Sequence, residues 1–365
     1  MKYRNFIAVL CVLLAIMLIV MGFNKYKLQQ EKLEENYQIA LQKQQKGKER
    51  ETLELNSNFY EKLKFGFDTS ILVLGNSIAL SEGATTESYW LNSLVEKLES
   101  KYNSQVWYHN LACRYMGYDA GYTQIATLDD SIDYDAVIIC YPPCMNDEDL
   151  IQYEAILFQV KNKYETATII SVMANSDQIV NPERTTDLVE YYDGVYVDMQ
   201  PVINESENSL IYQRIYPNDK GYGLYAEEVF AKIVDCVNEG KMTSKKVFPQ
   251  MEGVHQYKNC CFIPIQNCRK ISENTVVIDL SHFSGKICIQ TMWNSGRKAY
   301  DIYCDYGNWL TRNELNYEVS CWFDVFLMHD VPKADKEIMI QFSEDAKLSE
   351  VKGFYLISAN SIELE

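Results

Sequence analysis

The first hydrophobic feature of the chain is an uncharged apolar segment at residues 6–23, which Lys2 and Arg4 precede. As a helix with a rise of 1.5 Å per residue it would span about 27 Å, close to the hydrocarbon thickness of a bilayer. No small-residue cleavage site follows it. We therefore predict an uncleaved signal anchor at 6–23 behind a short tail at 1–5, with a cleaved signal peptide as the alternative.

The charges around this segment predict its orientation. A short tail with two positive charges favours a cytoplasmic N-terminus. Lys25, Lys27 and Lys32 follow the apolar segment and reduce the difference in positive charge between its two ends. We expect a single-pass protein of the cell membrane with its globular part outside the cytoplasm. Residues 24–64 carry apolar residues at helical spacing and predict a helical stalk, for which a homodimeric coiled coil is the alternative.

Short apolar strands alternate with helical segments between residues 65 and 240. The predicted strands are 71–74, 106–111, 136–140, 168–173 and 195–198. Helical periodicity appears at 90–98, 150–160 and 221–237. Continuous apolar strands joined by helices indicate a parallel sheet covered on both faces, and such sheets place functional residues after the carboxyl ends of their strands.

The pattern changes after a polar linker at 241–250, because only short strands follow it. They are predicted at 275–280, 286–292, 299–304, 322–328, 337–342 and 353–358. Strands at this spacing predict an antiparallel β-sandwich of the jelly-roll type over residues 251–365. Trp293 and Trp309 lie beside turn residues, so they are candidates for stacking on sugar rings, and a place in the sandwich core is the alternative.

Composition and charge narrow the function classes. The 365 residues carry a formal net charge of −17, from 34 Lys and Arg against 51 Asp and Glu. Nucleic-acid binding requires clustered basic residues, and the globular part has no such cluster, so we expect no nucleic-acid partner. The eleven cysteines form no C-x-x-C pair. We therefore predict free thiols, no metal and no cofactor, with one or two disulfides within 260–321 as the alternative.

One loop carries a candidate nucleophile. Ser77 follows the first predicted strand in the run LVLGNSIALSEGATTESYWLNSLVEKL at 72–98. This run resembles the first conserved block of the SGNH (GDSL-type) hydrolases, and further similar segments follow in order: HNLA at 109–112, DAVIICY at 135–141 and YPNDKGYGLYAEEV at 216–229. The resemblance implies a three-layer α/β/α, flavodoxin-like domain at 65–240 and an ester hydrolase of acylated carbohydrate.

The same resemblance implies that the catalytic set is degenerate. The family uses a serine nucleophile, a histidine base and an aspartate three residues before that histidine. Ser77 matches the nucleophile, but the histidine position holds Tyr216 and the aspartate position holds Gln213. A tyrosine with a pKa of about 10 is a poor proton acceptor at neutral pH, and glutamine has no carboxylate.

The oxyanion-binding set of the family is only partly matched. Its donors are the amide of Ser77, a glycine amide and an asparagine side chain. The asparagine position holds Cys144 without a gap, or Asn146 after a two-residue insertion. The glycine falls near Tyr115, and Gly117 is available after a shift.

These residues predict a membrane-anchored pseudoenzyme that binds or acts on acylated cell-envelope or extracellular polysaccharide. The first alternative is an active esterase or acetyltransferase that uses Ser77 with a non-standard base. His109 is the one histidine of the α/β region that could serve, and Cys144 is a candidate reactive thiol. The second alternative is a structural surface protein that dimerises through its stalk.

Overall fold

A computed structural model describes residues 38, 44–45, 47–129, 131–142, 144, 146–173, 182–199, 211–212, 216–242, 254–293, 296–305, 308–317, 323–343 and 347–364. The chain divides into two units, residues 1–57 and 58–365. In the first unit, residues 47–56 are helical, which agrees with the predicted helical stalk. The predicted anchor at 6–23 lies outside the described residues. In the described ranges, no helix combines the length and apolar character that a membrane span requires.

The second unit begins with a five-stranded parallel sheet in the order β2-β1-β3-β4-β5. Its strands are β1 (Thr69–Gly75), β2 (Val106–Asn110), β3 (Ala136–Tyr141), β4 (Thr168–Met173) and β5 (Val195–Asp198). The chain leaves β1 toward β2 on one side and reaches β3 on the other. In a doubly wound sheet of this order, ligands bind where the direction reverses, at the carboxyl ends of β1 and β3.

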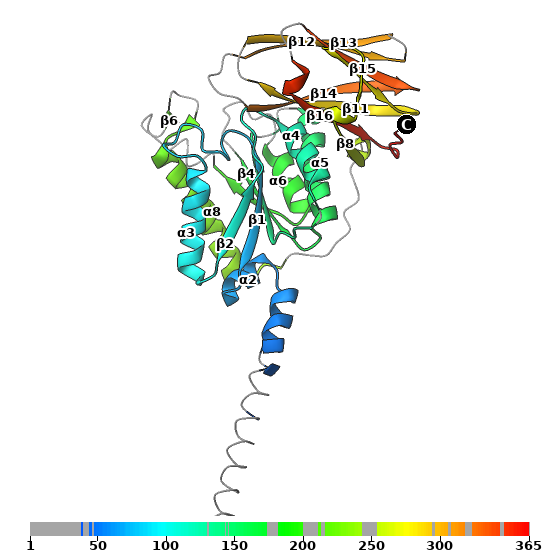
Figure 1. Cartoon of the computed structure of the whole chain (residues 1–365). Coiled ribbons are helices and arrows are strands. Elements are labelled where there is room, and N and C mark those ends of the chain that lie inside the picture. The colour runs from blue at the N-terminus through cyan, green and yellow to red at the C-terminus, as the bar shows by residue number, and fades with distance from the viewer. Residues whose placement is uncertain are drawn as a thin grey trace, which may run out of the picture. The chain divides into compact units, whose positions relative to one another are not determined.

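Helices cover both faces of this sheet (Figure 1). They are α2 (Phe59–Phe65), α3 (Tyr89–Tyr102), α4 (Tyr118–Thr127), α5 (Asp147–Lys163), α6 (Pro182–Tyr191) and α8 (Asp219–Glu239). Helices α2, α3 and α8 share one hydrophobic core with the sheet, whereas α4, α5 and α6 share the other. The predicted three-layer α/β/α, flavodoxin-like domain is confirmed.

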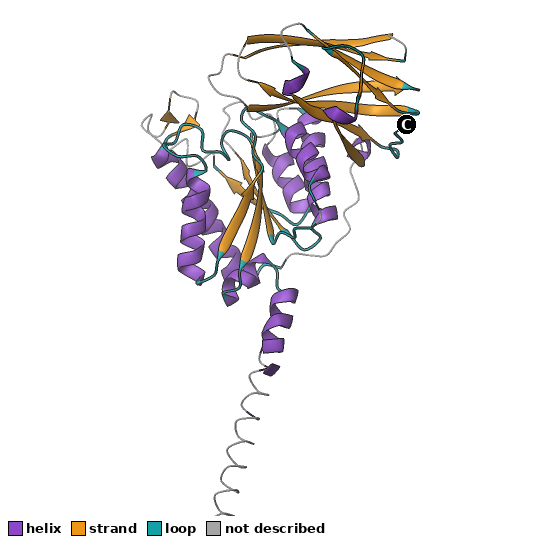
Figure 2. Cartoon of the chain, in the orientation of Figure 1, coloured by secondary structure: helices purple, strands orange, loops and turns teal. Residues whose placement is uncertain are grey.

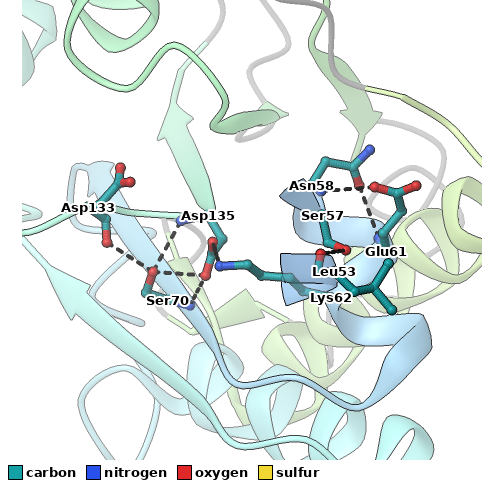
Figure 3. Close-up of polar contacts among 8 residues, drawn as sticks. All are labelled: Leu53, Ser57, Asn58, Glu61, Lys62, Ser70, Asp133 and Asp135. Carbon is teal, nitrogen blue, oxygen red and sulfur yellow. Dashed lines mark hydrogen bonds and ion pairs between the residues drawn. The ribbon is translucent and has the colours of Figure 1, made fainter. Parts of the chain in front are cut away.

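The folded unit starts at Asn58, seven residues before the boundary predicted at residue 65. Helix α2 belongs to it because Phe59 and Leu63 are fully buried. A polar network also joins α2 to the sheet (Figure 3): Lys62 Nζ lies 2.6 Å from Asp135 Oδ1, and Asp135 Oδ2 accepts the backbone N–H of Ser70. The segment that we assigned to the end of the stalk is therefore part of the sheet's support.

The C-terminal region forms two antiparallel sheets, β13-β12-β15-β10-β9 and β14-β11-β16-β8 (Figure 2). The strands are β8 (Asn259–Pro264), β9 (Arg269–Lys270), β10 (Thr275–Asp279), β11 (Phe283–Trp293), β12 (Gly296–Cys304), β13 (Asn308–Tyr317), β14 (Phe323–Ala334), β15 (Glu337–Phe342) and β16 (Val351–Ser358). The chain crosses between the sheets after β8, β10, β11, β13, β14 and β15. This alternation is the jelly-roll arrangement that the strand spacing predicts.

The sandwich packs directly on the α/β region instead of standing apart from it. One continuous hydrophobic core runs from β1 and α4 into β11 and β16. Within it, the Tyr122 hydroxyl donates to the carbonyl of Tyr257 at 2.5 Å. Lys286 Nζ of β11 lies 3.2 Å from Glu148 Oε1 of α5. The two regions are thus joined by both apolar and charged contacts.

Candidate functional site

The candidate site begins where β1 and β3 end side by side. A Cβ added to Gly75 would lie 2.6 Å from the carbonyl oxygen of Cys140, so no larger residue fits here without a shift. Asn76 Oδ1 then accepts the backbone N–H of Ile78 at 3.0 Å, which closes a tight turn. This turn places Ser77 at the reversal point of the sheet, the position predicted for a nucleophile.

Ser77 itself is enclosed, with 1% of its surface exposed. Its Oγ accepts the backbone N–H of Tyr115 at 3.0 Å. Among the described residues, this is the one hydrogen bond at the Ser77 hydroxyl. A serine hydroxyl needs a base to become a good nucleophile, and the part of the chain that the structure describes supplies none at Ser77 Oγ.

Three interactions fix the loop that carries Ser77. Arg114 Nε, from the loop after β2, lies 2.8 Å from Glu82 Oε2, and its Nη2 lies 3.3 Å from Glu87 Oε1. From the other side, the Tyr222 hydroxyl of α8 donates to the Glu82 carbonyl at 2.8 Å. The loops after β1 and β2 and helix α8 therefore form one connected wall around Ser77.

The start of α8 also holds the position that the family gives to histidine. Tyr216 lies in the short strand β7 (Tyr216–Pro217) and is half-buried against the core of α3 and α8. Asn218 caps α8, and Asp219 accepts the backbone N–H of Thr85 at 2.7 Å and its hydroxyl at 2.8 Å. The segment that resembles the family's histidine block therefore contacts the loop after β1, and it holds Tyr216. Gln213 lies outside the described residues.

The remaining oxyanion candidates have structural partners. Cys144 is buried with its Sγ 3.6 Å from the Tyr118 hydroxyl, and burial raises its thiol pKa to about 11. Asn146 caps α5, with its Oδ1 accepting the backbone N–H of Asp149 at 2.9 Å. Gly117 is the residue before α4. The donor that the structure brings to Ser77 is instead the amide of Tyr115.

Sequence patterns could indicate Tyr115 only through the family's glycine, because the contact uses the backbone. The residue adopts the left-handed conformation with φ of 61°, which glycine adopts at no steric cost. The side chain thus differs from the family while the local backbone is of the kind that a glycine would give.

His109 lies apart from Ser77. His109 pairs in register with Leu72, three residues or about 10 Å before the end of β1. Its Nδ1 lies 2.7 Å from the Tyr134 hydroxyl. Trp293 is the last residue of β11 and pairs with Phe323 of β14. Trp309 of β13 pairs with Tyr303 of β12. The side chains of both tryptophans are outside the described part.

The nine cysteines within the described ranges are all unpaired. Burial raises the pKa of Cys113 to about 11, and a hydrogen bond from Gln124 opposes this shift. The thiols of Cys113 and Cys144 are therefore protonated at neutral pH. In the same ranges, no group of three or more His, Cys, Asp or Glu side chains is placed to hold a metal ion.

The sheet order, the serine at its reversal point and the attached sandwich together define the fold of an SGNH-type hydrolase with a second, jelly-roll domain. No family model matches the chain, and no curated protein is similar to it in sequence. Among solved structures, it is similar to a two-domain esterase active on acetylated mannans, co-crystallised with mannopentaose. The identity is 15%, the TM-score is 0.64, and the match covers 82% of this chain and 94% of that one.

A second structure of a two-domain esterase active on acetylated mannans gives the same values. A psychrotrophic esterase, EstA from Pseudoalteromonas sp., matches at 14% identity with a TM-score of 0.40, over 47% of this chain and 100% of that one. The match to the mannan esterases extends over most of both chains, so the fold resemblance includes the order of the two domains.

Proposed function

We propose that this protein binds acetylated polysaccharide at the Ser77 site and has lost most or all of the ester hydrolysis of its fold class. One observation carries the proposal: Ser77 Oγ has the Tyr115 amide as its partner and no base among the described residues. The position that resembles the family's base holds Tyr216, three residues before the Asp219 that accepts the Thr85 hydroxyl.

General-base catalysis contributes about 10²–10⁴-fold to reactions of this kind, and nucleophile activation by serine depends on it. An enclosed serine that only accepts a hydrogen bond lacks this contribution. The walls of the site are nevertheless fixed by ion pairs and hydrogen bonds from three segments. A site that keeps its shape without its base is suited to binding more than to turnover.

The ligand class follows from the two-domain resemblance. The esterase with a TM-score of 0.64 acts on acetylated mannans, and its match includes 94% of that chain. We therefore propose acetylated mannan, or a related acetylated polysaccharide of the cell envelope or surroundings, as the ligand. The proposed signal anchor at 6–23 would hold the site at the outer face of the membrane.

Binding and hydrolysis can be separated in one set of measurements. The full chain in detergent is mixed with acetylated mannan and with the same mannan after alkaline deacetylation. In affinity electrophoresis, we expect acetylated mannan in the gel to slow the migration of the protein. We expect the protein to release acetate from this polymer at the same rate as the Ser77→Ala variant does. Equal mobility with and without acetylated mannan would contradict the binding role.

An active esterase is the second candidate, and one contact favours it. The Tyr115 N–H that meets Ser77 Oγ is a preorganised donor near the place where an oxyanion would develop. Under this alternative, acetate release from acetylated mannan is faster than the uncatalysed rate and disappears in Ser77→Ala. That result would replace the pseudoenzyme proposal.

A further inference from the structure

A polar cavity of about 1110 Å³ opens on the sandwich, beside the end of β10 and the turn between β14 and β15. Three cationic side chains and three carboxylates line it: Arg269, Lys333, Lys336, Asp279, Asp335 and Glu337. Their formal charges cancel, although the chain as a whole carries −17. Sites for small ligands have volumes of about 300–1,000 Å³, so the cavity is large enough to hold one.

The charged groups of this cavity hold one another in place. Arg269 Nη2 lies 2.6 Å from Asp279 Oδ1 and 2.9 Å from Glu337 Oε2. Lys333 Nζ lies 2.8 Å from Asp335 Oδ2. A carboxylate accepts several hydrogen bonds, and an ammonium or guanidinium group donates several. These pairs therefore keep hydrogen-bonding capacity for a ligand while their positions are fixed.

The backbone around the cavity is fixed as well. The Asp305 carboxylate accepts the backbone N–H of Asp335 on Oδ2 and that of Lys336 on Oδ1, each at 2.8 Å. On the other side, His282 also lines the cavity, and its Nδ1 lies 3.2 Å from Asp335 Oδ1. A preorganised site loses little conformational entropy when a ligand binds, so this arrangement favours binding.

A smaller cavity of about 250 Å³ adjoins the polar one, because Asp279 lines both. Its walls include the apolar side chains of Phe262, Ile278 and Leu364. The Phe262 ring contacts the Tyr355 ring, with 4.7 Å between the two centres. The pair of cavities thus combines charged hydrogen-bonding groups with an apolar surface.

The balance of charges indicates the class of ligand. A ligand with a net charge gains little from a lining whose charges cancel. A sugar hydroxyl is both a donor and an acceptor, so neighbouring hydroxyls can donate to the carboxylates and accept from the cationic groups. The C–H groups of a sugar ring match the apolar walls of the smaller cavity.

We propose that the two cavities bind neutral sugar units of a polysaccharide through their hydroxyls, whether or not those units are acylated. The inference rests on the proposed function for the identity of the polymer, mannan. It adds a second binding site that does not require the acetyl group.

This second site lies away from Ser77. The loop that meets Ser77 contacts β14 through Met116, whose Sδ accepts the backbone N–H of Phe326 at 3.2 Å. Lys333 lies seven residues further along β14, which is roughly 23 Å at a strand rise of about 3.3 Å per residue. Contact of one polysaccharide chain with both sites would raise its overall affinity.

Deacetylated mannan is the probe for this site, in affinity electrophoresis of the full chain in detergent. Lys333→Met removes an ammonium group from a side chain that is 72% exposed, and His282→Asn keeps a residue type that tolerates the left-handed φ of 54°. We expect the unchanged protein to be slowed. Each variant should bind about three- to tenfold more weakly, because it loses a hydrogen-bonding group, while its melting temperature stays the same.

Two matched variants serve as controls and should bind like the unchanged protein. Lys97→Met breaks a comparable ion pair on the α/β domain, where Lys97 Nζ lies 2.6 Å from Glu227 Oε1. His255→Asn changes an exposed histidine that lines neither cavity.

The outcomes separate this inference from the proposed function. Slowing by acetylated but not by deacetylated mannan would refute the second site and leave the proposed function standing. Unchanged affinity of both Lys333→Met and His282→Asn for deacetylated mannan would also refute it. Equal slowing by both polymers that weakens in Lys333→Met would support this site and contradict acetyl-dependent binding at Ser77.

Two further results would overturn the inference. Stronger slowing by polygalacturonate than by deacetylated mannan would replace the neutral ligand with an anionic one. If neither mannan slows the protein, both the proposed function and the second site are wrong.

Discussion

Lys286 offers a direct test of whether the two domains form one cooperative structure. Its side chain is 10% exposed, and its Nζ lies 2.9 Å from Asp330 Oδ1 of the sandwich and 3.2 Å from Glu148 Oε1 of α5. It also lies 5.8 Å from the centre of the Tyr257 ring. Burial alone would lower the pKa of Lys286, but the hydrogen bond to Asp330 and the two carboxylates raise it.

The cost of Lys286→Met can be worked from these contacts. Removing one partner of a fully buried ion pair costs about 3–5 kcal/mol. Here Glu148 and Asp330 are 50% and 77% exposed, so water can solvate them after the change and screening reduces the loss. Methionine keeps the aliphatic volume. We expect a loss of about 1–2 kcal/mol, which is roughly 2–3 °C in melting temperature for a unit of about 300 residues.

Differential scanning calorimetry at pH 7 measures the change in melting temperature that Lys286→Met causes. A raised lysine pKa contributes stability below the unfolded value and loses it only as the pH rises through the folded value, so the contribution is fully present at pH 7. We expect one transition in both proteins, shifted downward in Lys286→Met. The control is Lys333→Met, whose side chain is 72% exposed and which should shift by less than about 1 °C. An unshifted Lys286→Met, or a separate transition for the sandwich, would refute the reasoning.

Three further predictions concern the α/β domain. Burial lowers the pKa of Lys161 to about 8, so Lys161→Met should raise the stability at pH 7 by about 2 kcal/mol. Because the unfolded chain keeps that proton to about pH 10.4, this difference should shrink in urea melts as the pH rises from 8 to 10; growth of the difference would contradict the assignment. Gly75→Ala should cost about 1–3 kcal/mol in urea melts because its Cβ meets a backbone oxygen, whereas Gly223→Ala, with nothing within 4 Å, should stabilise helix α8; equal effects would refute the packing argument. Cys144, whose thiol pKa is about 11, should resist iodoacetamide at pH 8 in the folded protein and react in urea; rapid labelling of the folded protein would restore it as a thiol nucleophile.

Three strands have the bounds that the sequence predicts: β4, β5 and β15. Strand β4 is buried throughout, whereas the burial of β5 and β15 largely alternates, so both fully buried and one-sided strands can be predicted from their residues. Helix α4 was missed, since it is covered on both sides, by the sheet and by the sandwich, and therefore lacks a polar face. Strand β13 was also missed, because it lies at the edge of its sheet and carries many polar residues.

In the candidate site, the features that depend on side chains could be predicted, and those that depend on the backbone could not. Ser77 could be located because its turn requires particular side chains, Gly75 for close approach and Asn76 for the bend. The contact between the Tyr115 amide and Ser77 could not be predicted, because every residue type except proline can supply a backbone N–H donor. The shared hydrophobic core of the two domains could not be predicted either. The apolar residues of a strand face have the same sequence pattern whether that face packs on a sheet or on a helix.

The most direct test of the central claim is the intact mass of the full-length protein after reaction with a fluorophosphonate, which modifies activated serines. The account predicts an unchanged mass, because no described base faces Ser77 Oγ, and a parallel Ser77→Ala sample should be indistinguishable. A phosphonate adduct that forms in the unchanged protein and is absent from Ser77→Ala would show an activated serine and contradict the loss of esterase chemistry.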